Sequence, residues 1–422
     1  MRGIMRVIIS FFQKSSRRLP IGNNKGMVMA IILMLVAVLV ILGTTGVLTV
    51  TTDMKISSNF RENARALYDA EAGVNAVIAK VNDGTFTWPA TGNSQVVTVA
   101  CPSDFKFNGC AGAGTTSVTV TNVDGTYYQF QVTGYGYNNA AKTIEVRFKR
   151  KPAFDFGLFA DGVVDLKASV QVYSYNSNVT PNPTTTDSLH NGDVGSNTEI
   201  VGYNGTLVDG DAGLGASAGG TTATLNIKSG TVITGTSGTE VGRVDPDPLG
   251  AVGGELSAKF TTYSATNDNT LTGTTGVSGT VINGGATLVG KPGGANYYIS
   301  SLTLGNRDTL TVDTTNGPVN IYMTGELEAK NGSLINVTGS TLDFSIFSNS
   351  TDKIVFKHGS AFKGVVYAPY APIEMKNSAD TYGLIWGGSI DIKNSGQFYF
   401  DEALNDKFLS KKVTVASWKD VM

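Results

Sequence analysis

One uncharged and mostly aliphatic stretch stands out near the amino terminus of the 422-residue sequence. Residues 26–52 carry no charged side chain, and residues 27–42 are almost continuously aliphatic. About 20 apolar residues are enough for a helix to cross the hydrocarbon core of a bilayer. We therefore predict a membrane-spanning helix. The six basic residues before it and Asp53 after it predict a cytoplasmic amino terminus, with everything after residue 50 exported.

The apolar stretch continues into an amphipathic helical pattern. Apolar residues recur at three- and four-residue steps with charged residues mostly between them: Phe60, Ala64, Leu67, Val74, Val77, Ile78 and Val81. A removable secretory signal has a shorter apolar core that ends in a small-residue cleavage site, so this pattern differs from one. It predicts one helix from Met27 to about Asn82.

Short alternating runs follow, at residues 117–121, 127–132 and 142–150. Alternation places Ile144, Val146 and Phe148 on one face of a strand. Glycine-containing turns separate the runs, as in a small antiparallel sheet. We predict such a sheet over residues 85–152, packed on the helix as a head.

Beyond Pro152 one short motif recurs six times: an apolar residue, Lys, a small or polar residue, then Gly or Ser. The copies are Leu166-Lys167-Ala168-Ser169, Ile227-Lys228-Ser229-Gly230, Ala329-Lys330-Asn331-Gly332, Phe356-Lys357-His358-Gly359, Met375-Lys376-Asn377-Ser378 and Ile392-Lys393-Asn394-Ser395. The last three copies lie 19 and 17 residues apart. A parallel β-helix has this kind of period, because each coil buries its apolar face on its neighbours.

We therefore predict a mainly-β solenoid over residues 153–404, with 174–224 and 235–318 as insertions or less regular coils, and a tail over 405–422. The whole chain would then be an α+β protein. The register of the last three motif copies places their apolar residues in one inward column and their lysines beside it, facing solvent. These columns are Phe356, Met375 and Ile392, and Lys357, Lys376 and Lys393.

Composition and charge narrow the function. Charged residues are 16% of the chain, against roughly 25% in average soluble proteins. Removing the six basic residues of positions 1–26 from the total of 32 leaves 26 basic against 34 acidic residues, or about -8. Nucleic-acid partners are therefore not expected, because no basic cluster is visible.

Cys101 and Cys110 lie close together in a segment that should be exported. A disulfide between them is favoured over two free thiols, and two cysteines alone make a poor zinc site. Oxygen-rich triplets at 209–211, 245–247 and 267–269 could hold calcium, but none follows a complete coordination loop. We expect no metal and no cofactor.

Candidate catalytic residues are few. His190 lies in a polar loop, and His358 falls where other motif copies have Asn, so it is interpreted as a turn residue rather than a base. Solenoids also include polysaccharide-acting enzymes, which would use acidic pairs such as Asp161 with Asp165 or Asp391 with Asp401. Without a second chemical partner we assign no catalytic residue. The aromatic residues of this region are interpreted as core or stacking ladder rather than a sugar platform; they are Tyr297, Tyr367, Tyr370, Tyr382, Trp386 and Tyr399.

A family resemblance rests on the order of elements near the amino terminus. A short basic leader, Lys25-Gly26-Met27, the apolar helix, Asn59-Phe60-Arg61 and the segment 66–73 follow one another. Together, over about residues 20–82, they resemble the amino terminus of PilX-type pilins. The resemblance implies a leader over 1–26, a pilin helix over 27–84, and cleavage by prepilin peptidase between Gly26 and Met27, followed by methylation. It also implies a single-pass inner-membrane precursor with its carboxyl terminus outside, and then a place in a pilus or on the cell surface among other pilins and the assembly machinery.

Ile31 departs from the major-pilin pattern, which has Glu at the fifth residue after the cut. That carboxylate is thought to pair with a neighbouring subunit's amino terminus, and an unpaired charge in a bundle is costly, so Ile31 favours a tip or low-abundance role. Gly43 and Gly46 predict either local unwinding or close helix packing. Segments 364–369 and 399–404 also resemble a carboxyl-terminal module found behind PilX-like amino termini in surface proteins.

These expectations combine into two hypotheses. The first is a minor pilin-like component of a type IV pilus or related pseudopilus that displays a β-rich module for assembly or for adhesion to a surface glycan or protein. The alternative is a membrane- or pilus-displayed β-helix enzyme that acts on polysaccharide. The lack of a catalytic constellation favours the first, so we expect a protein that is not an enzyme.

Overall fold

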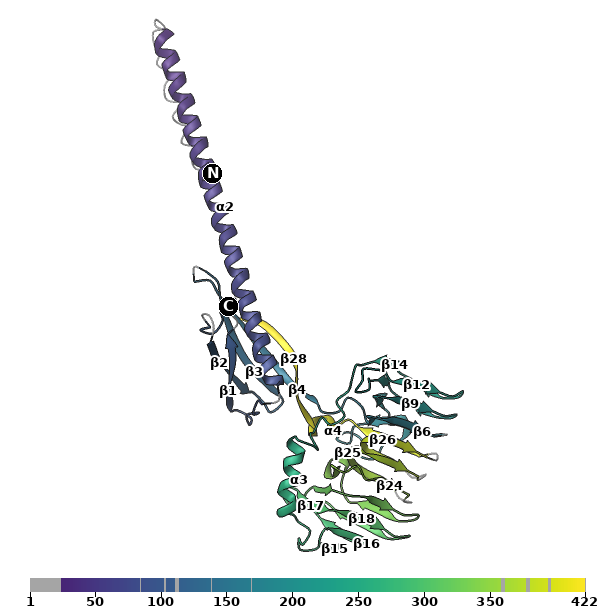
Figure 1. Ribbon diagram of the computed structural model, residues 1–422. Coiled ribbons are helices and arrows are strands. Elements are labelled where there is room, and N and C mark those ends of the chain that lie inside the picture. The colour runs from purple at the N-terminus through teal and green to yellow at the C-terminus, as the bar shows by residue number, and fades with distance from the viewer. Residues whose placement is uncertain are drawn as a thin grey trace. The chain divides into compact units, whose positions relative to one another are not determined.

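The computed structural model describes residues 24–83, 85–101, 104–110, 114–137, 139–167, 169–357, 361–376, 380–393 and 396–421. The chain forms two compact units: residues up to 80 with 87–147 and 417 onward, and residues 81–86 with 148–416. A long amino-terminal helix is followed by a largely β region (Figure 1). The coarse α+β prediction is therefore confirmed.

The amino-terminal helix α2 spans Asn24–Asn82. Its 59 residues correspond to about 88 Å of rise. The segment predicted to cross a membrane is long and apolar enough to do so. The helix stays wound at Gly43 and Gly46, where the hydroxyls of Thr44 and Thr45 donate to the carbonyl oxygens of Val40 (2.9 Å) and Ile41 (2.8 Å) one turn earlier.

The head is a five-stranded sheet with the strand order β1-β2-β3-β4-β28. Its strands are β1 (Ser94–Cys101), β2 (Gly114–Asn122), β3 (Tyr127–Tyr135), β4 (Ala141–Pro152) and β28 (Leu409–Val421). Ile144, Val146 and Phe148 are fully buried, as their alternation predicted. The segment predicted as a tail instead provides β28, because the last residues of the chain return to pair beside β4.

The helix packs on the head through most of its predicted apolar face, with one exception. Val74, Val77 and Val81 are fully buried as predicted, whereas Phe60 is 76% exposed. The predicted apolar face was therefore wrong at Phe60. Ala66 and Ala70, which the periodicity did not single out, are also fully buried, because the sheet approaches the helix backbone closely at these small residues.

The second unit is a ladder of short strands. Its first half contains β5 (Leu158–Ala160), β6 (Val163–Leu166), β7 (Gln171–Tyr175), β8 (Val194–Ser196), β9 (Glu199–Gly202), β10 (Leu207–Val208), β11 (Ala212–Leu214), β12 (Thr224–Ile227), β13 (Val232–Ile233) and β14 (Ser237–Glu240). The short helix η1 (Thr185–Asp187) lies between β7 and β8. Strands β8 to β11 therefore lie within 174–224, which the sequence indicated as an insertion or less regular coils.

Its second half contains β15 (Thr275–Ser278), β16 (Val281–Val289), β17 (Ala295–Ile299), β18 (Ser301–Leu304), β19 (Thr309–Asp313), β20 (Val319–Met323), β21 (Leu327–Ala329), β22 (Leu334–Val337), β23 (Phe344–Ser348), β24 (Ile354–Phe356), β25 (Phe362–Met375), β26 (Thr381–Ile392) and β27 (Gln397–Asp401). Helix α3 (Glu255–Ala265) precedes these strands, η2 (Thr341–Asp343) interrupts them, and α4 (Leu404–Lys407) follows them.

Most strands pair in parallel with the strand three places further along the chain. Thus β17 pairs with β20 and β20 with β23, while β18 pairs with β21 and β21 with β24. The same step links β5 to β8 and β8 to β11. Three strands therefore make one repeat of the ladder, and β15, which pairs antiparallel with β16, stands outside this pattern.

The two halves of the ladder meet in its middle. Strand β26 pairs with both β5 and β6, and β27 pairs with β7. The first repeat in sequence therefore lies directly on the last one, and the outer ends of the ladder are formed by β12–β14 and by β15–β16. Figure 1 shows this order, with β14, β12, β9, β6, β26, β25, β24, β18 and β16 following one another along the ladder.

The repeated motif marks one column of this ladder. Phe356 is in register with Met375, Met375 with Ile392, and Ile392 with Leu166. Ala329 continues this column beyond Phe356. On the other side, Leu166 is in register with Gly202, and Gly202 with Ile227. Phe356, Met375 and Ile392 are at most 5% exposed. The predicted inward column is therefore confirmed.

A second column is aromatic and outward-facing, yet it is buried. It contains Tyr298, Tyr322, Phe347, Tyr367, Trp386 and Phe159, each in register with the next. Residues 244–263, here called the strap, lie over it. Within the strap, Phe260 packs edge-on against Tyr322, and Asp247 accepts a hydrogen bond from the hydroxyl of Tyr367 at 2.5 Å.

Candidate assembly site and charged ladder

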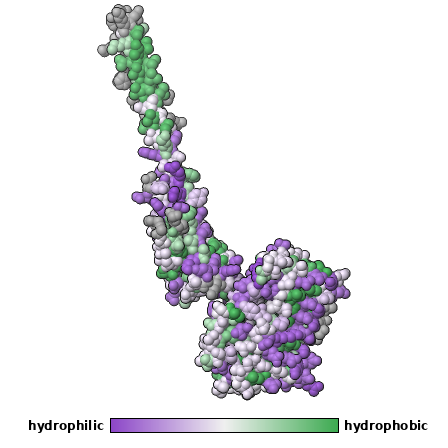
Figure 2. Space-filling view, viewed as in Figure 1, coloured by the Kyte–Doolittle hydropathy of each residue, from purple (hydrophilic) through white to green (hydrophobic). Residues whose placement is uncertain are grey.

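The predicted cleavage residues lie at the start of the exposed part of α2. Met27 is 64% exposed, and the large apolar side chains between 27 and 42 are all at least half exposed. Figure 2 shows this part of the helix as a hydrophobic surface. Ile31 is 57% exposed on it. Such a surface requires a membrane or other helices around it, because water would otherwise be in contact with a whole apolar helix.

Two glycines of the head let strand β3 approach the helix closely. A Cβ atom added at Gly134 would lie 2.1 Å from the carbonyl oxygen of Ala66 and 2.2 Å from the amide nitrogen of Ala70. One added at Gly136 would lie 2.4 Å from the carbonyl oxygen of Glu62. The segment that resembles the PilX pattern thus contributes Ala66 and Ala70 as the contact for Gly134, and Glu62 as the contact for Gly136.

Two buried carboxylates of α2 face loops of the head. Oε2 of Glu62 accepts a hydrogen bond from the backbone amide of Tyr137 at 2.6 Å. Asp69 is 1% exposed, and burial raises its pKa although a backbone hydrogen bond from Lys106 lowers it. Sequence reasoning missed both residues, because charged side chains on an amphipathic helix are expected to face solvent. The signal available was the pair of glycines around Tyr135, which marks a close backbone approach.

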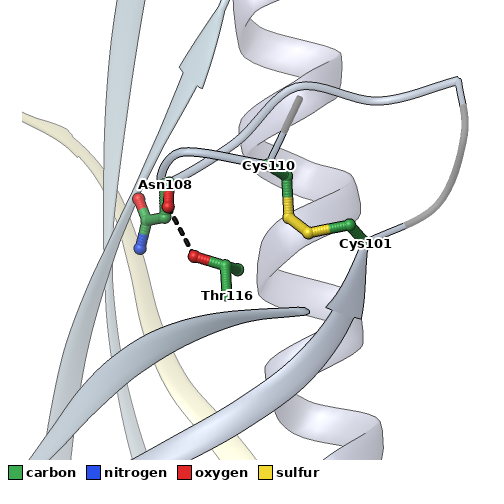
Figure 3. The surroundings of a disulfide bond; sticks show 4 residues. All are labelled: Cys101, Asn108, Cys110 and Thr116. Atoms are coloured by element: carbon green, nitrogen blue, oxygen red, sulfur yellow. Dashed lines mark hydrogen bonds between the residues drawn. A yellow bond between two sulfur atoms is a disulfide. The ribbon is translucent and has the colours of Figure 1, made fainter. Parts of the chain in front are cut away.

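A disulfide joins Cys101 and Cys110, with their Cα atoms 5.5 Å apart (Figure 3). The hydroxyl of Thr116 donates to the carbonyl oxygen of Asn108 at 2.5 Å, and the Asn108 side chain accepts from the amide of Thr133 at 2.7 Å. Asn108 has a φ of 43°, a region that Asn tolerates better than most residues. The loop is thus held at both ends.

The residues considered for catalysis are occupied by structural contacts. Asp161 accepts from Asn197 at 2.7 Å and pairs with Arg243 at 3.0 Å. Asp401 is fully buried and accepts from the hydroxyl of Thr341 and from the amides of Ser177 and Ala403.

Of the two histidines, the structure describes His190, which pairs with a carboxylate. His190 lies 2.9 Å from Asp209, where burial raises the carboxyl pKa but hydrogen bonds from Ser188 and His190 hold it below its usual range. His358 lies outside the described residues. Over the described ranges no group of three or more His, Cys, Asp or Glu residues could hold a metal.

The aromatic residues are core or stacked, as predicted for most of them. Tyr297, Tyr367 and Trp386 are at most 1% exposed. The rings of Tyr382 and Tyr399 stack with centroids 4.9 Å apart, and Tyr399 is 3% exposed. The exception is Tyr370, which is 38% exposed, and its hydroxyl donates to Asp247 at 2.8 Å.

The lysines of the repeated motif form a column on the outside of the ladder. In sequence-motif order they are Lys167, Lys228, Lys330, Lys357, Lys376 and Lys393, with Tyr203 in the same column between Lys167 and Lys228. A column of carboxylates runs beside the lysines. In four of the repeats a carboxylate stands two residues before the motif lysine: Asp165, Glu328, Glu374 and Asp391. Sequence inspection could have found this column, since acid, apolar residue and Lys recur together.

The lysine column and the carboxylate column together are here called the charged ladder. Glu374 lies at its centre. Its side chain is 6% exposed and pairs with Lys353, Lys376 and Lys393, the last at 2.6 Å. Burial alone would raise its pKa, but hydrogen bonds from the three ammonium groups outweigh burial and hold the pKa at about 2. The carboxylate is therefore charged throughout the physiological range.

Comparisons with known proteins agree with the reading of the amino terminus. Residues 25–75 match the family model described as PilX N-terminal. Residues 300–407 match a domain of unknown function (DUF7305), which covers both segments predicted to resemble a carboxyl-terminal surface module. A comparison with curated proteins finds no match.

Among solved structures, the competence-associated pilin ComZ from Thermus thermophilus is similar at 10% identity and a TM-score of 0.31, covering 85% of this chain and 97% of that one. The family match over residues 25–75 shows that the chain carries a PilX-type amino terminus, and the resemblance predicted from its sequence is confirmed.

Proposed function

We propose that this chain is a minor pilin-like component of a type IV pilus or related pseudopilus. The observation that carries the proposal is the exposed apolar surface of 27–42, which begins directly after Gly26 on a helix with a PilX-type sequence. Before assembly this surface would hold the precursor in the inner membrane, with the carboxyl terminus outside the cytoplasm. During assembly it would pack against the helices of other pilins.

Processing would follow the pilin pattern, with prepilin peptidase cutting between Gly26 and Met27. Amino-terminal sequencing of protein extracted from membranes should then begin at Met27. A Gly26→Val variant should accumulate uncut, while a Gly22→Val variant, in the leader but away from the cut, should be processed normally. A chain intact from Met1, or one cut near residue 50, would contradict the assignment.

The exposed Ile31 supports a tip or low-abundance place in the fibre. A subunit in mid-fibre would need a carboxylate here to pair with its neighbour's amino terminus, whereas an apolar side chain leaves that amine unpaired. Ile31→Glu should raise the amount of this chain in sheared pili, and Ile32→Glu, one position on, should not. Equal amounts for wild type and both variants would argue against this placement.

We further infer that the ladder is a parallel β-helix whose first and last coils pack together. The repeat of three strands and the inward column support this reading. A Leu166→Cys, Ile392→Cys pair occupies adjacent register positions, about 4.8 Å apart in a sheet, and should form a disulfide. The control pair Leu166→Cys, Leu304→Cys, several repeats apart, should stay reduced.

The ladder would be a displayed module for assembly or surface adhesion. The chain enters and leaves this module at neighbouring points, because the amide of Ala153 donates to the carbonyl oxygen of Phe408 at 2.8 Å. Replacing 154–407 by a short Gly-Ser turn should therefore keep β4 and β28 paired. If the truncated chain enters pili but cells lose attachment, the module serves adhesion; loss of pili would assign it to assembly.

The enzyme alternative requires free carboxylates on the ladder. Asp161, Asp165 and Asp391 each pair with a cation, and Asp401 is fully buried. These contacts support a structural role. Release of reducing ends from polysaccharides by purified protein, abolished by Asp161→Asn, would favour the enzyme instead.

A further inference from the structure

The charged ladder combines cations and anions in two straight, parallel columns. The backbone amides of successive column lysines bond to the preceding repeat, as in Lys376 to Phe356 and Lys393 to Met375, both at 2.7 Å. From Lys330 to Lys228 the column has seven successive positions, and the six strand spacings between them amount to about 29 Å. The backbone positions of the column are therefore evenly spaced along one edge of the module, and six of the seven hold a lysine, with Tyr203 at the remaining one.

The two columns are not balanced. The lysine column has six cations, and the neighbouring column has four carboxylates. Lys330 is 4.0 Å from Glu328 with its side chain 46% exposed, and Lys228 bonds only to the neutral amide of Asn226, at 2.9 Å, among the contacts of the described residues. These two lysines, one at each end, contribute least to the internal ion pairs and remain most available to a ligand.

We propose that the charged ladder binds a linear acidic polysaccharide that lies along the lysine column. Sugar carboxylates would accept hydrogen bonds from the lysines, and sugar hydroxyls would donate to Glu328, Asp391 and Asp165. A polymer with both groups on each repeat matches a surface that offers donors and acceptors side by side. Duplex nucleic acid fits less well, because its dense phosphates would meet the carboxylate column and it has few hydroxyls to donate.

This inference rests on the proposed role as a displayed surface module, but its test needs no pilus. Purified full chain in non-ionic detergent is titrated with polygalacturonate, with neutral dextran and with duplex DNA. Binding to polygalacturonate should exceed binding to the other two polymers and should weaken as salt is raised. A failure here would leave the pilin assignment unaffected, because that assignment is tested by processing and assembly.

The decisive variant is Lys228→Ala with Lys330→Ala, because both lysines are exposed and peripheral to the internal ion pairs. Its dissociation constant should rise about three- to tenfold, since each exposed charge contact contributes modestly. The matched control is Lys149→Ala with Lys259→Ala, which removes the same charge outside the ladder. Tyr203→Lys, which fills the remaining place in the column between Lys167 and Lys228, should tighten binding.

The proposal is overturned by absence of polygalacturonate binding, by equal weakening in both double variants, or by tighter binding of duplex DNA. Thermal melts of all variants provide the remaining check. If the ladder variant melts earlier but binds like wild type, the lysines only stabilise the fold and the proposal fails.

Discussion

The indole nitrogen of Trp386 donates a hydrogen bond to the carbonyl oxygen of Pro246 at 2.7 Å, although the two residues lie 140 positions apart. Trp386 belongs to the aromatic column, and Pro246 belongs to the strap that covers it. The bond therefore connects the covering segment to the second half of the ladder.

Replacing Trp386 by Phe should destabilise the protein by about 1–3 kcal/mol, because the Pro246 carbonyl loses its donor and a small void forms. The free energy of unfolding from denaturant titration measures this. Trp418→Phe, at a residue 43% exposed, is the matched control and should change little. A larger effect at Trp418 would contradict the buried hydrogen bond.

Met375→Ala should cost about 2–5 kcal/mol, because it opens a cavity in the inward column. Lys376→Ala should stay within roughly 0.5 kcal/mol, since Glu374 keeps Lys353 and Lys393 as partners. Thermal melts compare the two variants. If the lysine proves the more damaging change, the register of the ladder is wrong.

Acid should weaken the charged ladder within a defined pH window. The pKa of Glu374 falls from 4.5 to about 2 on folding, so its contribution is complete above about pH 4.5 and is lost as pH falls toward 2. Unfolding free energies of wild type and Glu374→Gln at pH 7 and pH 2 test this: the variant should lose less stability on acidification. Identical pH dependence would refute the role of Glu374.

Gly134→Ala should disrupt the packing of the head on its helix, because the new Cβ would overlap the backbone of Ala66 and Ala70. Overpacking of this kind costs about 1–3 kcal/mol or more. Gly219→Ala, where the nearest atom lies 3.8 Å away, should be close to neutral. Protease resistance of the head in membranes distinguishes the two, and equal resistance would speak against the close approach.

Cys101→Ser should lower the stability of the head by about 2–3 kcal/mol, because the disulfide closes a short loop in the unfolded chain. The double variant Cys101→Ser, Cys110→Ser should match the single one. Peptide mass mapping without reduction provides the direct check on wild type. Two free thiols in exported protein would be incompatible with the pairing.

The sequence by itself determined the elements whose signals are local. The uncharged run of 26–52 specifies a long apolar helix, because its residues are uncharged and mostly apolar over a length that spans a bilayer. The last three copies of the repeated motif specified the inward column as well, because their apolar residues Phe356, Met375 and Ile392 recur at the same place in each repeat. Strand alternation likewise located Ile144 and Val146 in the core of the head.

Only the tertiary structure decided which of these elements meet. No local sequence pattern predicts that β5 and β6 pair with β26, or that β28 pairs with β4 in the head. These pairings join residues more than 200 positions apart. The same holds for Phe60, which helical periodicity alone assigned to the buried face. Which helix residues the head covers depends on contacts such as the close approach of Gly134 to Ala66, and that approach exists only once helix and sheet have packed together.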